Sequence, residues 1–150
     1  MTADQARTLI AGRFSGAQVD GTAPIVISVP VDAWVPFAHF ARIELGCRFF
    51  SFLTAVDWKE QGLEVVYKAD NLDDNVSLLV KTRLGPSVTE CPSLTPEYAG
   101  ANWMERECYD MFGIRFDGHP DLRRILLGND WVGHPLLKSY AVDTPHPPYR

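Results

Sequence analysis

Residues 49–86, FFSFLTAVDWKEQGLEVVYKADNLDDNVSLLVKTRLGP, decide the fold, because they contain three consecutive stretches typical of β-strands. The first, residues 49–58, is aromatic and mostly apolar, which predicts a central strand covered on both faces. In residues 63–68 and 76–83, apolar and polar side chains alternate, as in strands with one buried face. The two connections are short and rich in turn-forming residues. The pattern predicts an antiparallel meander.

Helices and one further strand are expected before this meander. Thr2 and Gln5 have the spacing of a capping box at the start of a first helix. Residues 25–29 are rich in β-branched side chains, which predicts a short strand. Apolar residues at helical spacing predict a second helix over residues 34–45, with Asp32 as its N-terminal cap.

A third helix is expected after the meander. Asn102, with Glu105 three residues later, has the spacing of a capping box, and Gly113 is a natural C-terminal stop. The order of elements favours an α+β fold, in which helices pack on a mostly antiparallel sheet. We expect residues 1–113 to form this α+β domain.

Residues 114–150 differ in composition from the rest of the chain. They contain five of the eleven prolines and show no sustained period of 2 or 3.6 residues. They nevertheless keep large apolar residues, which a free disordered tail lacks. We expect an extended C-terminal arm that lies on another surface, either its own domain or a partner chain. The apolar residues of this segment are Phe116, Leu122, Ile125, Leu126, Leu127, Trp131, Leu136 and Leu137.

The composition excludes several classes of protein. The 150 residues suffice for one domain with its own core, and 46% hydrophobic with 22% charged residues is ordinary for a globular protein. A formal charge of −5 without a long basic run argues against nucleic-acid binding. No apolar stretch approaches the roughly 20 residues that span a bilayer. Three cysteines exclude a four-cysteine zinc or iron–sulfur site within this chain.

The densest group of charged residues is the stretch ERECYD, which begins at Glu105. One hypothesis makes Glu105 and Glu107 a catalytic acid–base pair. Residues two apart on a helix point about 160° away from each other, however, so both cannot act on one substrate. We favour a second hypothesis, in which these two residues, Arg106, Tyr109 and Asp110 form a face that engages a partner or the arm. Arg106 and Asp110 have the i, i+4 spacing of an ion pair.

Polar residues of the arm offer two further candidates. His119 and His134 each lie between a glycine and a proline, so turns hold their backbones. A fixed imidazole suits a metal ion or a hydrogen bond to a neighbour, and the absence of ligand spacing favours the hydrogen bond. Arg123 and Arg124 follow Asp121, either in a solvated turn or, as we favour, as arginine anchors of an interface.

Several of these motifs together resemble one known family. Residues 105–114 (ERECYDMFGI), 118–126 (GHPDLRRIL), 130–131 (DW) and 133–136 (GHPL) are similar, in order and spacing, to the thirty-kilodalton subunit of respiratory complex I. In bacteria the members of this family are the C-type subunits of NADH-quinone oxidoreductase. Residues 53–57 (LTAVD) also resemble the family.

The resemblance implies a non-catalytic structural and assembly subunit in the hydrophilic part of a proton-pumping NADH-quinone oxidoreductase. It implies that the chain packs against the quinone-site subunit (forty-nine-kilodalton or D-type) and carries no cofactor. Iron–sulfur clusters, FMN and quinone then belong to partner subunits. The expected location is peripheral, on the cytoplasmic face of the bacterial inner membrane, without a membrane span. The residues expected to bind partners or anchor the arm are Glu105, Arg106, Glu107, Tyr109, Asp110, His119, Arg123, Arg124, Asp130, Trp131 and His134.

Two alternatives remain at this point. The first is the equivalent scaffold subunit of a membrane-bound hydrogenase, or of a complex fed by ferredoxin or reduced deazaflavin. The second is a small free-standing metalloenzyme that uses His119 and His134 as metal ligands.

Overall fold

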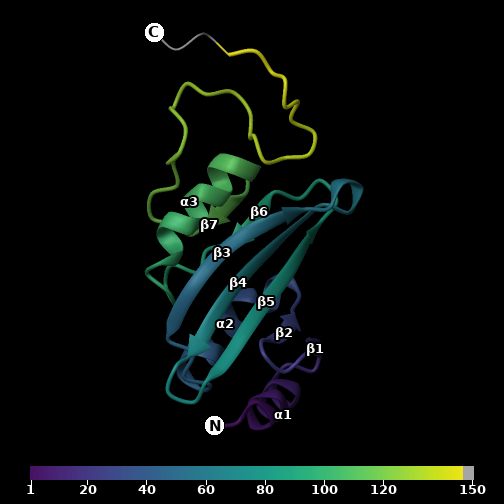
Figure 1. The fold of residues 1–150 in the computed structure, drawn as a ribbon, viewed down its shortest axis with the longest axis vertical. Helices are drawn as coiled ribbons and strands as arrows, with labels where there is room; N and C mark the ends of the chain where they lie inside the picture. The colour runs from purple at the N-terminus through teal and green to yellow at the C-terminus, as the bar shows by residue number, and fades with distance from the viewer. Residues whose placement is uncertain (147–150) are drawn as a thin grey trace.

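Helices pack on a five-stranded, mostly antiparallel sheet, as expected for an α+β fold (Figure 1). The computed structural model describes residues 1–146, and the end of the predicted arm, residues 147–150, lies outside the described part. The strand order is β1-β2-β5-β4-β3, and of these pairs β2–β5 is parallel. The strands are β1 (Gln18–Asp20), β2 (Ile25–Ser28), β3 (Phe49–Asp57), β4 (Leu63–Asn71) and β5 (Val76–Gly85).

The expected meander β3–β4–β5 is confirmed, but the prediction that its first strand is central is wrong. β3 lies at one edge of the sheet, whereas β4 is buried along nearly its whole length. The aromatic residues of β3 have two different roles. Phe50 stacks on Tyr98, with ring centroids 4.7 Å apart, while Phe49 and Phe52 are exposed. The edge of β3 approaches the third helix, where the N–H of Leu53 lies 3.1 Å from Met104 Sδ.

The first two helices, α1 (Ala3–Arg13) and α2 (Trp34–Ile43), contribute the apolar side chains that cover the inner face of the sheet. The capping box at the start of α1 is confirmed. Asp32, in contrast, does not cap α2. The chain enters α2 through a 3₁₀ turn that contains Asp32, so that residue lies within the turn and not at the helix start. The buried residues of α2 are Trp34, Phe37, Ala38, Phe40 and Ala41.

The third helix, α3 (Ala101–Phe112), ends at Gly113 as predicted. Gly113 has a left-handed backbone with φ of 75°, and an added Cβ would lie 2.8 Å from the ring of His134, so the position requires glycine. The predicted capping box at Asn102 and Glu105 is wrong. Gly100 precedes the helix without a side-chain cap, and Glu105 points into the interior.

Two short strands, β6 (Glu90–Pro92) and β7 (Arg115–Asp117), form a small parallel sheet that the sequence did not indicate. Ile114 and Phe116 are buried in the core. The first residues of the predicted arm therefore belong to the body of the protein. Residues 118–146, which we call the distal arm, contain no helix or strand and lie against α3 from its first turn to its C-terminal end (Figure 1).

Candidate partner-binding site

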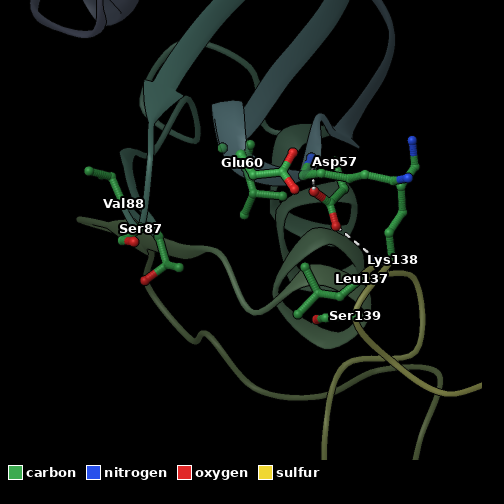
Figure 2. A pocket seen from close by; sticks show the side chains of 11 residues that line it. Asp57, Glu60, Ser87, Val88, Leu137, Lys138 and Ser139 are labelled. Carbon is green, nitrogen blue, oxygen red and sulfur yellow. Dashed lines mark hydrogen bonds between the residues drawn. The ribbon is translucent and has the colours of Figure 1, made fainter.

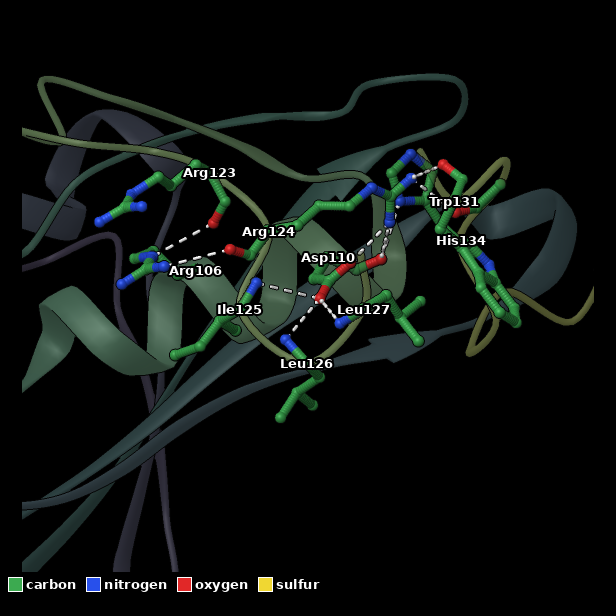
Figure 3. Close-up of polar contacts among 10 residues, drawn as sticks. Arg106, Asp110, Arg123, Arg124, Ile125, Leu126, Leu127, Trp131 and His134 are labelled. Carbon is green, nitrogen blue, oxygen red and sulfur yellow. Dashed lines mark hydrogen bonds and ion pairs between the residues drawn. The ribbon is translucent and has the colours of Figure 1, made fainter. Parts of the chain in front are cut away.

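Asp110 on α3 is the centre of the contacts that hold the distal arm (Figure 3). Its side chain is fully buried. Its Oδ2 accepts hydrogen bonds from the backbone N–H groups of Ile125, Leu126 and Leu127, at 3.2, 2.8 and 2.9 Å. Its Oδ1 lies 2.6 Å from Nη1 of Arg124. One carboxylate therefore fixes four consecutive residues of the distal arm.

Arg124 extends this network across the distal arm. Its side chain is 13% exposed, and its Nη2 donates to the carbonyl oxygens of Trp131 (3.1 Å) and Gly133 (2.9 Å). Burial raises the pKa of Asp110, but Arg124 and the three amides outweigh it and hold that pKa below its usual range. Asp110 is therefore an anion at neutral pH, in a charge-assisted network that ties two separate turns to α3.

Arg106 makes a second connection, one turn earlier on α3. Its Nε and Nη2 donate to the carbonyl oxygens of Arg123 and Arg124, at 3.2 and 3.1 Å (Figure 3). Its guanidinium also lies over the ring of Trp103, 5.0 Å from the centroid. The expected i, i+4 ion pair of Arg106 with Asp110 is wrong, because both side chains bind the arm instead.

The two histidines bind opposite ends of α3. His119 Nε2 lies 3.0 Å from the carbonyl oxygen of Asn102, and its Nδ1 accepts the N–H of Asp121 at 3.0 Å. His134 Nδ1 lies 2.9 Å from the carbonyl oxygen of Asp110. Eight residues of helix, about 12 Å, separate the two backbone partners.

The two imidazoles are hydrogen-bonded at opposite ends of α3, so they are not placed to share one metal ion in this structure. Within residues 1–146, no group of three His, Cys, Asp or Glu side chains is placed to hold a metal ion. The hydrogen-bonded interpretation of both imidazoles is confirmed.

Other predicted residues face outward. Arg123 pairs with Asp121 at 2.9 Å, and both side chains are mostly exposed, so Arg124 and not Arg123 is the buried anchor. Glu107 and Asp130 are exposed as well.

The two predicted aromatic residues are partly buried and make ring contacts within the chain. Trp131 stacks on His146, with ring centroids 4.3 Å apart, and Tyr109 packs edge-on against His134.

Glu105, in contrast to Glu107, is fully buried. Its carboxylate accepts the N–H of Leu94 at 2.6 Å and the hydroxyl of Ser93 at 2.7 Å. The two glutamates therefore face different environments, which agrees with the rejection of an acid–base pair. A partner-binding role for the eleven residues remains a prediction, because the contacts that they make in the structure lie within the chain.

The outer surface of the distal arm is apolar at several positions. Leu126, Leu136 and Val132 are 61, 52 and 87% exposed. Leu122, Leu127 and Leu137 instead pack against the core. The arm therefore covers its own domain with one set of apolar residues and presents another set outward.

A second attachment of the arm, which the sequence pattern did not indicate, lies at the β3–β4 hairpin (Figure 2). Asp57, the last residue of β3, accepts the backbone N–H of Lys138 at 2.8 Å across 81 positions of sequence. A cavity of about 530 Å³ lies beside this contact, between the hairpin, residues 87–89 and residues 137–139. The similarity of residues 53–57 to the family was the one signal that pointed to this position.

None of the helices formed by residues 1–146 has the length and apolar character needed to cross a membrane.

Comparison with known proteins relates the chain to one family. Residues 27–146 match the family model described as respiratory-chain NADH dehydrogenase, 30 Kd subunit. The C-type subunit of NADH-quinone oxidoreductase from Rhodobacter capsulatus is 42% identical over 120 residues, which cover 77% of this chain and 60% of that protein. The C/D-type subunit of NADH-quinone oxidoreductase from Phocaeicola vulgatus is 46% identical over 93 residues, 61% of this chain and 18% of that protein. The chain thus spans less than two thirds of these relatives.

A solved structure shows the same fold. The trypsin-resistant fragment (1-134) of Nqo5 superimposes with a TM-score of 0.67 at 26% identity, covering 79% of this chain and 98% of that fragment. The family model spans most of the described residues, including α3, Asp110 and the distal arm. The chain belongs to the family of the 30 Kd subunit of respiratory-chain NADH dehydrogenase.

Proposed function

We propose that this chain is a structural and assembly subunit of a proton-pumping NADH-quinone oxidoreductase, and that its distal arm docks on the D-type subunit. The observation that carries the proposal is the division of the arm into two faces. Its polar groups bind α3, while Leu126, Val132 and Leu136 point outward. The C/D-type relative, whose name joins both parts in one protein, supports the choice of partner.

The exposed side chains fit a protein interface. Burial of one large aliphatic side chain is favourable by roughly 1.5–3 kcal/mol of free energy. A partner surface that covers these side chains would gain this free energy of burial. The segment is also held in shape before binding, so docking does not require the arm to be ordered. Exposed Arg123 and Trp103 add the residue types that are enriched in interfaces.

The motif residues that look catalytic have structural contacts in this chain. Asp110, His119 and His134 bind backbone groups, and Glu105 binds the Ser93-Leu94 turn. We therefore propose that the chain has no catalytic residues of its own. FMN, iron–sulfur clusters and quinone would belong to partner subunits, and the complex would hold the chain peripherally at the cytoplasmic face of the inner membrane.

Co-purification tests the proposal. The chain is tagged in its native complex and carries Leu126→Ser, Val132→Ser and Leu136→Ser together. We expect recovery of the D-type subunit and of NADH-quinone reductase activity to fall at least tenfold, with unchanged thermal stability of the isolated chain.

The matched control is Leu72→Ser. Leu72 is equally exposed but lies in the β4–β5 turn near the N-terminus, at the other end of the molecule from the arm (Figure 1). Equal recovery of the D-type subunit by the triple variant and the control would refute the docking site. Co-purification of the wild-type chain with nickel-containing hydrogenase subunits, and not with NADH-quinone activity, would assign it to the alternative complex.

A further inference from the structure

Glu105 lies in the first half of α3, and its hydrogen-bond partners belong to a different segment from the distal arm. Its fully buried carboxyl instead binds the Ser93-Leu94 turn, which follows β6. We propose that Glu105 is a pH-sensitive contact that joins α3 to this turn, tight when the carboxyl is neutral and weakened when it is ionised. Regulation of this kind is independent of the proposed partner.

The hydrogen bonds around Glu105 suit both protonation states. Ser93 Oγ lies 2.7 Å from Glu105 Oε2 and 2.8 Å from Thr95 Oγ1, and it accepts the N–H of Thr95 at 3.1 Å. The Ser93 hydroxyl can donate to an ionised Glu105, or it can accept from a neutral one and donate to Thr95. Both protonation states therefore find hydrogen-bond partners in the closed turn, and what differs is the buried charge of the ionised form. Opening the turn to water relieves the desolvation cost of that charge, so ionisation favours opening of the contact.

The ionised form of Glu105 lacks a countercharge. The titratable groups that face it are the thiols of Cys91 on β6 and Cys108 on α3, and both are buried. No lysine, arginine or histidine among residues 1–146 forms an ion pair with Glu105. Asp110 is buried to the same degree on the same helix, but Arg124 compensates its charge. Burial of an unpaired charge disfavours the charged form.

The resulting pH dependence has a defined sign. Burial raises the pKa of Glu105 from 4.5 to about 7, although the bonds from Leu94 and Ser93 act in the opposite direction. A raised pKa in the folded state means that the folded protein binds an extra proton between these values. The stability contributed by neutral Glu105 is therefore complete below pH 4.5 and is lost as the pH rises to about 7.

The contact lies where the distal arm leaves the body of the protein. The N–H of Ser93 donates to the carbonyl oxygen of Asp117, the last residue of β7, at 2.8 Å. The turn at Ser93-Leu94 thus joins α3, which anchors the arm, to the strand from which the arm starts. Weakening this junction loosens the arm at its origin.

The test compares urea unfolding of the full-length wild-type chain, Glu105→Gln and Glu107→Gln from pH 5 to pH 8. The glutamine side chain of Glu105→Gln would reproduce the neutral carboxyl, with an oxygen for Leu94 and an amide group for Ser93. We expect the folding equilibrium constant of the wild type to fall, relative to Glu105→Gln, on the order of 50-fold over this range. Glu107→Gln, an exposed position on the same helix, should follow the wild type.

Parallel pH profiles for the wild type and Glu105→Gln would overturn the proposal. If Glu105→Gln does not fold, hydrogen exchange of the Leu94 amide in the wild type decides. After correction for the intrinsic exchange rate, its opening equilibrium must increase at least tenfold between pH 5 and pH 8. Constant protection would overturn the proposal equally.

Discussion

Replacement of Asp110 by asparagine tests whether a single carboxylate holds the distal arm. The substitution keeps the shape of the side chain and exchanges one oxygen for an NH₂ group. That group must face either Arg124 or the N–H groups of residues 125–127, and all of these are donors. Neither rotamer of the amide can satisfy both sets, so one set loses its acceptor.

The size of the effect follows from the burial of Arg124. Removal of one partner from a buried ion pair costs about 3–5 kcal/mol. Arg124 is 13% exposed and keeps the carbonyl oxygens of Trp131 and Gly133 as acceptors. Because Arg124 keeps these acceptors, we expect Asp110→Asn to cost about 3 kcal/mol, the lower end of that range. This cost corresponds to roughly a 150-fold change in the equilibrium between the docked and the open arm.

Hydrogen exchange with mass spectrometry measures this change directly. The polar contacts of Asp110 are with residues 124–127 of the arm, so the loss should appear as opening of residues 118–137 while β4 keeps its protection. Asp121→Asn is the matched control, because Asp121 forms an exposed pair with Arg123 and its loss should change stability by less than about 0.5 kcal/mol. Low pH should have the same effect as Asp110→Asn. Because the pKa of Asp110 is lowered in the folded protein, ionised Asp110 stabilises the docked arm fully above pH 3.8, and this stabilisation is lost as the pH falls further.

Equal protection of the arm in Asp110→Asn and Asp121→Asn would refute the reasoning. It would mean that the apolar contacts of the arm with the core hold it without the buried charge network.

Three further predictions concern neighbouring positions. Gly113→Ala should destabilise the chain by about 1–3 kcal/mol, because alanine disfavours the left-handed backbone and its Cβ meets His134; thermal unfolding measures this. Arg124→Ala should lower the free energy of opening of the arm by several kcal/mol, whereas Arg123→Ala should change it by less than about 0.5 kcal/mol. Hydrogen exchange of the arm amides measures both changes. A chain that ends after Asp117 should fold cooperatively, whereas one that ends after Gly113 should lose much of its stability, because it lacks two buried residues and β7; circular dichroism during urea unfolding distinguishes the two.

Local sequence patterns predicted the meander but not the order of its strands. The strands over residues 63–68 and 76–83 are confirmed, but only β5 shows the alternating burial that the pattern predicts, because β4 is buried on both faces. β3 lies at the edge because β2 pairs with β5 and not with β3. That pairing joins distant parts of the chain, so local patterns do not reveal it. β6 and β7 have three residues each, too few for a periodic pattern, and each is stabilised by the other.

The candidate site shows the same limit. The motif drew attention to Arg106 and Asp110, and local rules then paired them with each other and assigned Glu105 to a capping box. Contacts with Arg124 and Leu94, 14 and 11 residues away, replace both local pairings. Nothing in local spacing could reveal them, since they depend on how the arm and the Ser93-Leu94 turn meet α3.

Arg106 and Asp110 of α3 share one physical role with Arg124 of the distal arm. A segment without helix or strand still carries backbone N–H and C=O groups, and these need partners when they are covered. Asp110 accepts from three such N–H groups, and Arg106 and Arg124 each donate to two carbonyl oxygens of the distal arm. Two charged side chains of α3, together with Arg124 of the arm, thus supply the hydrogen-bond partners that a neighbouring strand supplies in a sheet. Some apolar side chains of the arm, such as Leu126 and Leu136, still face outward. Hydrogen bonding to the backbone of the distal arm therefore accounts for Arg106 and Asp110 of the charged motif.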